Sequence, residues 1–229
     1  FNTDRSQTEA RVIDLSAGFV ASHPALFEGA PFEANAYNIP YRFVGKPRSV
    51  LILGAGMGND VAAALRAGAG RVAAVEIDPT IVALGRRLHF EKPYDSPRVR
   101  LVLDDARAYV QNAREAFDLI VYSLLDSHTT HSNFSSIRID NYVYTTEAIE
   151  AARRLLSPEG VLIVKFQVQR PWIAGRLRDT LTAVFGSEPL QLQGDHSGLT
   201  TSGSFFVTGS QDTIRRALSD ERLVAYIAA

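Results

Sequence analysis

The stretch Val50-Leu-Ile-Leu-Gly-Ala-Gly-Met-Gly-Asn-Asp60 decides the fold of this 229-residue chain. An apolar run of strand length leads into a turn with glycines at Gly54, Gly56 and Gly58, and a helix is expected from residue 59. Glycines let the backbone approach a ligand closely, and the first N–H groups of a helix are free to bind one. The stretch therefore predicts a ligand-binding strand–turn–helix unit, although glycines spaced in this way also fit a tight turn without a ligand.

Beyond this unit, β-branched runs alternate with helical stretches. This alternation predicts an α/β fold, a Rossmann-like doubly wound sheet with helices on both faces. We expect strands at 50–54, 72–77, 99–103, 118–122 and 161–166, and helices at 59–67, 79–89, 105–113 and 146–156. The remaining expected elements are a helix at 172–185, strands at 189–193 and 204–208, and a helix at 211–218. Residues 1–46 are assigned to a small N-terminal strand and cap segment, and 47–229 to the main domain.

Composition excludes several classes of protein. A hydrophobic content of 46% rules out disorder, and 24 Lys+Arg against 25 Asp+Glu give no basic surplus for a nucleic-acid partner. The absence of cysteine excludes disulfides, thiol chemistry and cysteine-bound zinc. Apolar stretches are far shorter than the ~20 residues of a membrane-spanning helix, so no span is predicted in this chain. Because the chain begins at Phe1, we expect it to be part of a longer polypeptide.

Two carboxylates follow consecutive strands and point to an adenosine pocket. Glu76 lies twenty residues after Gly56 at the end of the second expected strand, where a carboxylate can accept hydrogen bonds from both ribose hydroxyls. Asp105 follows the third strand and can accept a hydrogen bond from an adenine amino group, while a flanking apolar residue packs on the ring. Each acid has a simpler interpretation as the N-cap of the following helix, and for Asp105 alone the two are evenly matched.

Five motifs, in this order and spacing, resemble the class I S-adenosylmethionine-dependent transferases, and within that group the spermidine synthases, or polyamine aminopropyltransferases. They are Val50–Gly58, Val75–Pro79, Leu103–Tyr109, Phe117–Tyr122 and Tyr144–Glu147. The resemblance implies a seven-stranded sheet whose last strand is antiparallel. It also implies that residues 47–229 bind S-adenosylmethionine, its decarboxylated form or methylthioadenosine. Together with the pocket above, it predicts these cofactor-binding residues: Gln7, Gly54, Gly56, Gly58, Asp60, Glu76, Ile77, Asp105, Ala106 and Tyr122.

The same resemblance exposes two departures in the half of the site that would confer aminopropyl transfer. Aminopropyltransferases carry acids where this chain has Met57 and Ser123, and those acids hold the donor's ammonium and help to deprotonate the attacking amine. A second acid of the family corresponds to Asp126. Residues 123–141 form a long loop, which we interpret as an acceptor-side lid with Asp126, His128 and Ser123 as catalytic residues. A metal site using Asp126, His128 and His131 is a weaker alternative, and a solvated loop without catalytic function is another.

The predicted function is therefore transfer of a methyl or other alkyl group from S-adenosylmethionine or an analogue to an unknown nucleophile. Aminopropyl transfer to a polyamine is the first alternative, and a non-catalytic nucleoside-sensing domain is the second. The expected partner is a small-molecule acceptor. Tyr142 and Trp172 are candidates to line its pocket, although aromatic residues at such positions more often belong to the core. A homo-oligomer is possible. The expected location is the cytoplasm, either as a free protein or as the cytoplasmic domain of a membrane-associated one.

Overall fold

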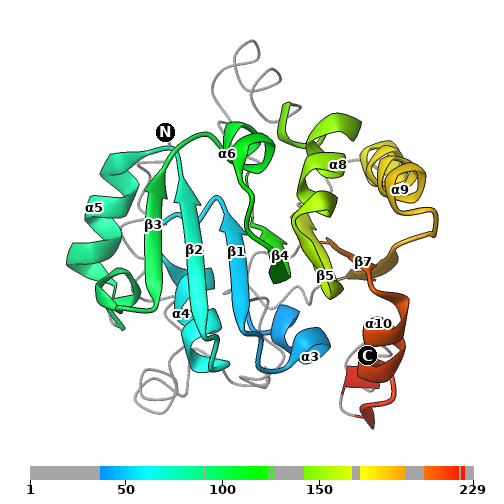
Figure 1. Cartoon of the computed structure of the whole chain (residues 1–229), viewed down its shortest axis with the longest axis horizontal. Helices are drawn as coiled ribbons and strands as arrows, with labels where there is room; N and C mark the ends of the chain where they lie inside the picture. Colours follow the sequence, from blue (N-terminus) through cyan, green and yellow to red (C-terminus); the bar gives the residue numbers. More distant parts are fainter. Residues whose placement is uncertain are drawn as a thin grey trace.

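The computed structural model describes residues 37–89, 91–123, 125, 142–166, 171–193, 204–221 and 223–224. Its centre is a seven-stranded sheet of order β3-β2-β1-β4-β5-β7-β6 (Figure 1). Strands β1 to β5 run parallel, and β7 is antiparallel to both β5 and β6. The predicted fold class and the antiparallel last strand are thus confirmed. The strands are β1 (Ser49–Leu53), β2 (Arg71–Glu76), β3 (Val99–Leu103), β4 (Phe117–Tyr122), β5 (Leu156–Phe166), β6 (Leu190–Gln193) and β7 (Ser204–Gly209).

Helices cover both faces of this sheet. One face packs against α3 (Pro40–Val44), α4 (Asn59–Arg66), α5 (Pro79–Leu88), the 3-10 helix η3 (Pro93–Asp95) and α10 (Gln211–Ala217). The other packs against α6 (Ala106–Asn112), α8 (Thr146–Arg154) and α9 (Pro171–Phe185). Side chains of a strand alternate between the faces, so in β1 Val50 and Ile52 enter one apolar cluster while Leu51 enters the other. A sheet covered on both faces explains the continuous apolar runs in the sequence.

Several helices begin where the sequence places a capping side chain. Asp78 accepts a hydrogen bond from the N–H of Thr80 at 2.7 Å, and Thr145 from that of Ala148 at 3.3 Å. Ser210 does the same at the start of α10. A side-chain oxygen at this position satisfies an N–H that has no partner within the helix, which fixes the starting residue. None of the described helices is long and apolar enough to cross a membrane.

The segment 157–160 differs from expectation. The sequence predicts a helix over 146–156 and a strand only from residue 161, but α8 ends at Arg154. The segment then continues as part of β5, whose pairing shifts from Phe117 opposite Leu156 to Leu119 opposite Val161. Residues 157–160 thus form an irregularity within β5, because β4 pairs with β5 both before and after them.

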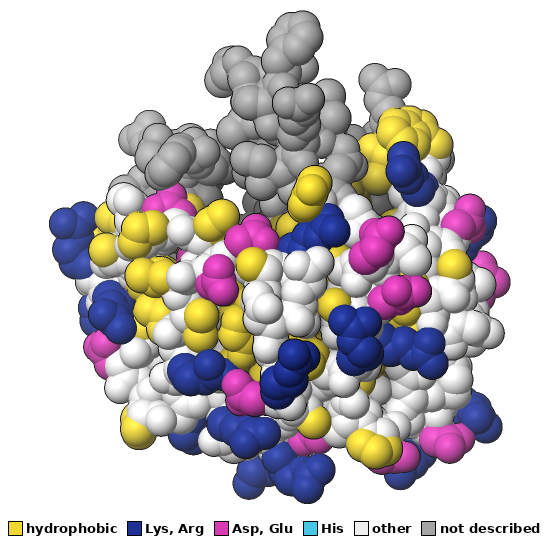
Figure 2. All heavy atoms as spheres, turned by 45° about the horizontal axis from the view of Figure 1, so that its top comes forward, with side chains coloured by type: hydrophobic (Ala, Val, Ile, Leu, Met, Phe, Trp, Pro, Cys, Tyr) yellow, Lys and Arg dark blue, Asp and Glu magenta, His cyan; other side chains and the backbone are white. Residues whose placement is uncertain are grey.

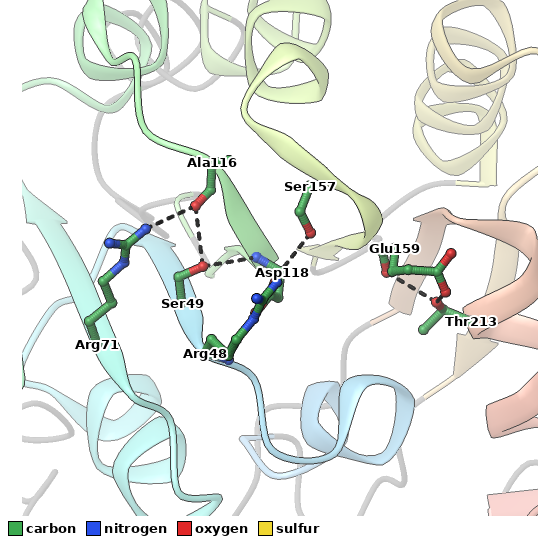
Figure 3. Close-up of polar contacts among 8 residues, drawn as sticks. All are labelled: Arg48, Ser49, Arg71, Ala116, Asp118, Ser157, Glu159 and Thr213. Atoms are coloured by element: carbon green, nitrogen blue, oxygen red, sulfur yellow. Dashed lines mark hydrogen bonds and ion pairs between the residues drawn. The ribbon is translucent and has the colours of Figure 1, made fainter.

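A polar network ties the amino-terminal ends of β1, β4 and β5 together (Figure 3). The Asp118 carboxylate accepts hydrogen bonds from the backbone N–H of Arg48 at 2.8 Å and from the Ser157 hydroxyl at 2.9 Å. Partial burial raises the pKa of Asp118, but the hydrogen bonds and the charge of Arg48 outweigh it and leave the pKa below its usual value. This network lies at the edge of the sheet opposite the carboxyl ends of the parallel strands.

Candidate functional site

The strand order places the candidate site at the carboxyl ends of β1 and β4. From β1 the chain proceeds outward to β2 and β3, and then returns to β4 on the other side of β1 (Figure 1). In open α/β sheets the crevice at such a reversal is where ligands bind. The residues that follow these strands, including the glycine turn, Ile77, Asp105 and Ser123, consequently share one edge.

The glycine turn after β1 is held from several sides. Gly54, Gly56 and Gly58 have φ values of 76°, 56° and 105°, a left-handed region in which other residues are strained. The Tyr94 hydroxyl donates to the carbonyl of Gly56 at 2.6 Å. Helix α5 also approaches closely, since a Cβ at Gly85 would lie 2.4 Å from the Met57 carbonyl oxygen. These contacts fix the shape of the turn.

Glu76 has a second role that the sequence analysis did not identify. One of its oxygens accepts from the N–H of Gly56 at 2.8 Å, and the other from the N–H groups of Ile77 and Asp78 at 2.9 and 3.0 Å. The residue is buried, at the predicted end of β2. An ionised carboxylate offers about four lone-pair sites, so acceptor capacity remains for a ribose hydroxyl. Glu76 thus joins the glycine turn to β2 at the predicted ribose position.

Asp105 is the N-cap of α6, which is the simpler of the two interpretations of this residue. Its Oδ1 accepts from the N–H of Ala108 at 2.9 Å. The cap does not exclude adenine binding, because it occupies only one carboxylate oxygen. Beside it, Ala106 is buried, whereas Ile77 is 62% exposed and Leu103, opposite Glu76 in β3, is 56% exposed.

This exposed apolar surface suits an aromatic base. The view in Figure 2 brings the carboxyl edge forward and shows hydrophobic and acidic side chains side by side toward β3. Ile77 was predicted from the sequence, but Leu103 was not. The signal that could have identified Leu103 was its position at the end of the third expected strand.

Beyond β4, four side chains from distant parts of the chain form a cluster: the half-buried Tyr37 and the buried Asp60, Ser123 and Lys165. The Ser123 hydroxyl donates to Asp60 Oδ2 at 2.6 Å, and Lys165 Nζ forms an ion pair with Asp60 Oδ1. Lys165 Nζ also lies 4.8 Å from the centre of the Tyr37 ring. Asp60, Ser123 and Lys165 are only 5%, 3% and 4% exposed.

This cluster changes the interpretation of two predicted residues. Asp60 was predicted to bind cofactor and Ser123 to act in catalysis, but in the structure each has the other as a partner. Burial and the nearby Asp60 charge raise the pKa of Tyr37 to about 12, so its ring is neutral. Sequence reasoning missed Lys165, although one lysine within the apolar run 161–166 was a visible signal.

Other predicted residues have different outcomes. Tyr122 is fully buried in the core, and its hydroxyl has no hydrogen-bond partner among the described residues, so its contact with a cofactor stays a prediction. Tyr142 and Trp172 are exposed rather than buried in the core, and the Arg107 guanidinium lies 4.2 Å from the Tyr142 ring centre. Gln7, Asp126, His128 and His131 lie outside the described residues. Within the described ranges, no group of three or more histidines and acids is placed to hold a metal ion.

The sheet order and the strand-end site define the class I methyltransferase-like fold. Solved structures with this fold include spermidine synthase from Thermotoga maritima, at TM-score 0.64 and 18% identity, covering 86% of this chain and 69% of that one. Another is human methyltransferase-like protein 13 in complex with SAH, at TM-score 0.57 and 19% identity over 93% of this chain and 92% of the other. Within this fold, the chain belongs to the spermine/spermidine synthase domain family, whose model matches residues 34–184.

Sequence relatives agree with the family. The polyamine aminopropyltransferase of Pyrobaculum calidifontis is 33% identical over 127 residues, which cover 52% of this chain and 41% of the relative. That of Nitrosomonas europaea is 32% identical over 149 residues, covering 62% of this chain and 43% of the relative. The matched part thus spans about two fifths of the length of these relatives. The resemblance derived from the motifs is confirmed.

Proposed function

We propose that this chain binds the adenosine part of decarboxylated S-adenosylmethionine and transfers its aminopropyl group to a small-molecule amine. The observation that carries this proposal is the Glu76 carboxylate, fixed against the glycine turn at the point where the strand order reverses. Membership of the spermine/spermidine synthase domain family supports the aminopropyl group in particular. The comparisons therefore favour aminopropyl transfer over the methyl transfer that the sequence analysis ranked first.

In this mechanism the described residues act mainly by holding the donor. Glu76 accepts a hydrogen bond from a ribose hydroxyl, Asp105 accepts one from the adenine amino group, and Ile77 packs on the ring. The amine nitrogen attacks the carbon bound to the sulfonium sulfur, the C–S bond breaks, and methylthioadenosine leaves with the electron pair. Because the positive charge of the sulfonium disappears as the bond breaks, alignment of the reactants contributes more than stabilisation of new charge.

The attacking amine must lose a proton, because alkylamines are protonated at neutral pH. Ser123 cannot take up this proton effectively, and its hydroxyl already donates to Asp60. We assign the base to Asp126 or His128. Replacing either with alanine should leave nucleoside affinity nearly unchanged and greatly reduce turnover, because a base acts on the transition state rather than on donor binding.

Methyl transfer from S-adenosylmethionine is the second candidate. The observation favouring it is the uncharged, buried Met57 in the glycine turn, where aminopropyltransferases are expected to carry an acid. The third interpretation, a nucleoside-sensing domain, fits the buried Ser123–Asp60 contact, which leaves no base among the four clustered side chains.

Product analysis separates the three functions. The protein is incubated with each donor and a panel of amines, and the nucleoside products are identified by mass spectrometry. Methylthioadenosine formed with an aminopropylated amine supports the proposal, whereas S-adenosylhomocysteine as the sole product overturns it in favour of methyl transfer. If calorimetry shows nucleoside binding but no amine gives product with either donor, the sensing function replaces both.

A further inference from the structure

The cluster beyond β4 has the composition of a binding site for an ammonium group. Asp60 supplies a carboxylate, Tyr37 the face of an aromatic ring, and Ser123 a hydroxyl that holds the carboxylate in place. Carboxylates and aromatic faces are the two protein features that bind ammonium groups most strongly. The ammonium present in this site is that of Lys165, which contacts both Asp60 and the Tyr37 ring.

The location of this cluster relates it to transfer chemistry. Asp60 lies two residues after Gly58, at the first turn of the helix that follows the glycine turn. Ser123 directly follows β4, and Lys165 lies near the carboxyl end of β5. In the proposed function the nucleoside lies over β1 to β3 against Glu76 and Asp105, so the acceptor approaches from the side of β4 and β5, where these side chains lie.

We propose that Asp60, Tyr37 and Ser123 form an ammonium subsite that Lys165 permanently occupies, so that a second ammonium of a diamine acceptor is excluded from it. Because the Lys165 ammonium is covalently attached to the protein, its effective concentration at the subsite is far higher than that of a free amine. The consequence for the acceptor rests on the proposed function: the preferred acceptor carries one amino group and no second cation directed at Asp60. The occupied subsite itself does not depend on turnover.

A Lys165→Ala variant tests the subsite by binding, without need for catalysis. The substitution removes the side chain beyond Cβ, which corresponds to a propylammonium ion, and leaves the Asp60 carboxylate buried without its cation, so the variant should unfold at a lower temperature than wild type. Propylammonium should raise its melting temperature by roughly 3–6 °C at about ten times Kd, compared with sodium at equal ionic strength. Wild type and the double variant Asp60→Asn/Lys165→Ala should show no such shift.

A folded Lys165→Ala protein that responds to propylammonium no more than to sodium would overturn the proposal and leave a purely structural ion pair between α4 and β5. If Lys165→Ala is recovered only unfolded, its refolding yield from urea is measured with each cation. A higher yield with propylammonium supports the subsite, and equal yields overturn it.

The acceptor consequence is tested with butylamine and putrescine, which have the same chain length and differ by one amino group. With decarboxylated S-adenosylmethionine, the ratio of kcat/KM for putrescine to that for butylamine should rise about tenfold or more from wild type to Lys165→Ala. An unchanged ratio would overturn this consequence. Absence of turnover with both amines in both proteins would instead contradict the proposed function, while the thermal measurements still decide the subsite.

Discussion

Replacing Glu76 with glutamine should weaken both nucleoside binding and the fold, and the structure allows the two effects to be separated. The carboxylate accepts hydrogen bonds from three backbone N–H groups, including that of Gly56. A glutamine amide has only one acceptor oxygen, so at least one buried N–H loses its partner. That loss costs about 1–3 kcal/mol, which for a domain of this size lowers the melting temperature by roughly 2–12 °C.

The ribose contact is measured by comparing two ligands rather than two proteins. In wild type, methylthioadenosine should bind about tenfold to a hundredfold more tightly than its 2′-deoxy counterpart, because a hydrogen bond to a charged acceptor contributes about 1.5–3 kcal/mol. In Glu76→Gln this difference should shrink, since a bond to a neutral amide contributes about 0.5–1.5 kcal/mol. Titration calorimetry gives all four affinities, and Glu150→Gln, an exposed position on α8, is the matched control.

An equal penalty for the missing hydroxyl in wild type and Glu76→Gln, with both proteins folded, would refute ribose recognition by Glu76. The residue would then serve only to fix the glycine turn. The melting temperature measured in the same samples reports that structural role independently.

The remaining predictions concern three other sites. Asp105→Ala should destabilise the protein by about 0.5–2 kcal/mol through loss of the helix cap, and should also reduce the preference for adenosine over inosine ligands, whereas Asp105→Ser should lose only the preference, because serine still caps the helix. Urea unfolding measures the stability and calorimetry the preference. An unchanged preference in both variants would contradict adenine recognition. Gly85→Ala should distort the glycine turn, because its Cβ would meet the Met57 carbonyl, and so lower nucleoside affinity in a protein that still folds; unaltered affinity would show that the turn adjusts freely. Asp118 should stabilise the fold above the ordinary pKa of its carboxyl, and this contribution should be lost as the pH falls through its lowered folded-state pKa. The gap in unfolding free energy between wild type and Asp118→Ala should therefore be full at about pH 7 and shrink below about pH 4, as measured by urea unfolding; a gap that grows on acidification would contradict the sign of the shift.

The order of the elements and the positions of Glu76 and Asp105 at the strand ends could be predicted from the sequence. Runs of β-branched residues alternating with helical stretches indicate a parallel sheet, and the carboxyl ends of parallel strands meet at one edge. Glu76 and Asp105 could therefore be placed near the glycine turn although none of these residues is adjacent in sequence. The motifs around them were also sufficient to indicate the family.

The cluster around Asp60 could not be predicted from the sequence, because it depends on tertiary packing. The pairing of Lys165 with Asp60 joins residues 105 positions apart, and no local pattern specifies which face of β5 the lysine side chain occupies or what lies opposite it. The close approach of Gly85 to the glycine turn is a similar case. Periodicity fixes which residues form a strand or a helix, whereas the partner of a buried charge is fixed only when distant elements pack and exclude water from between them.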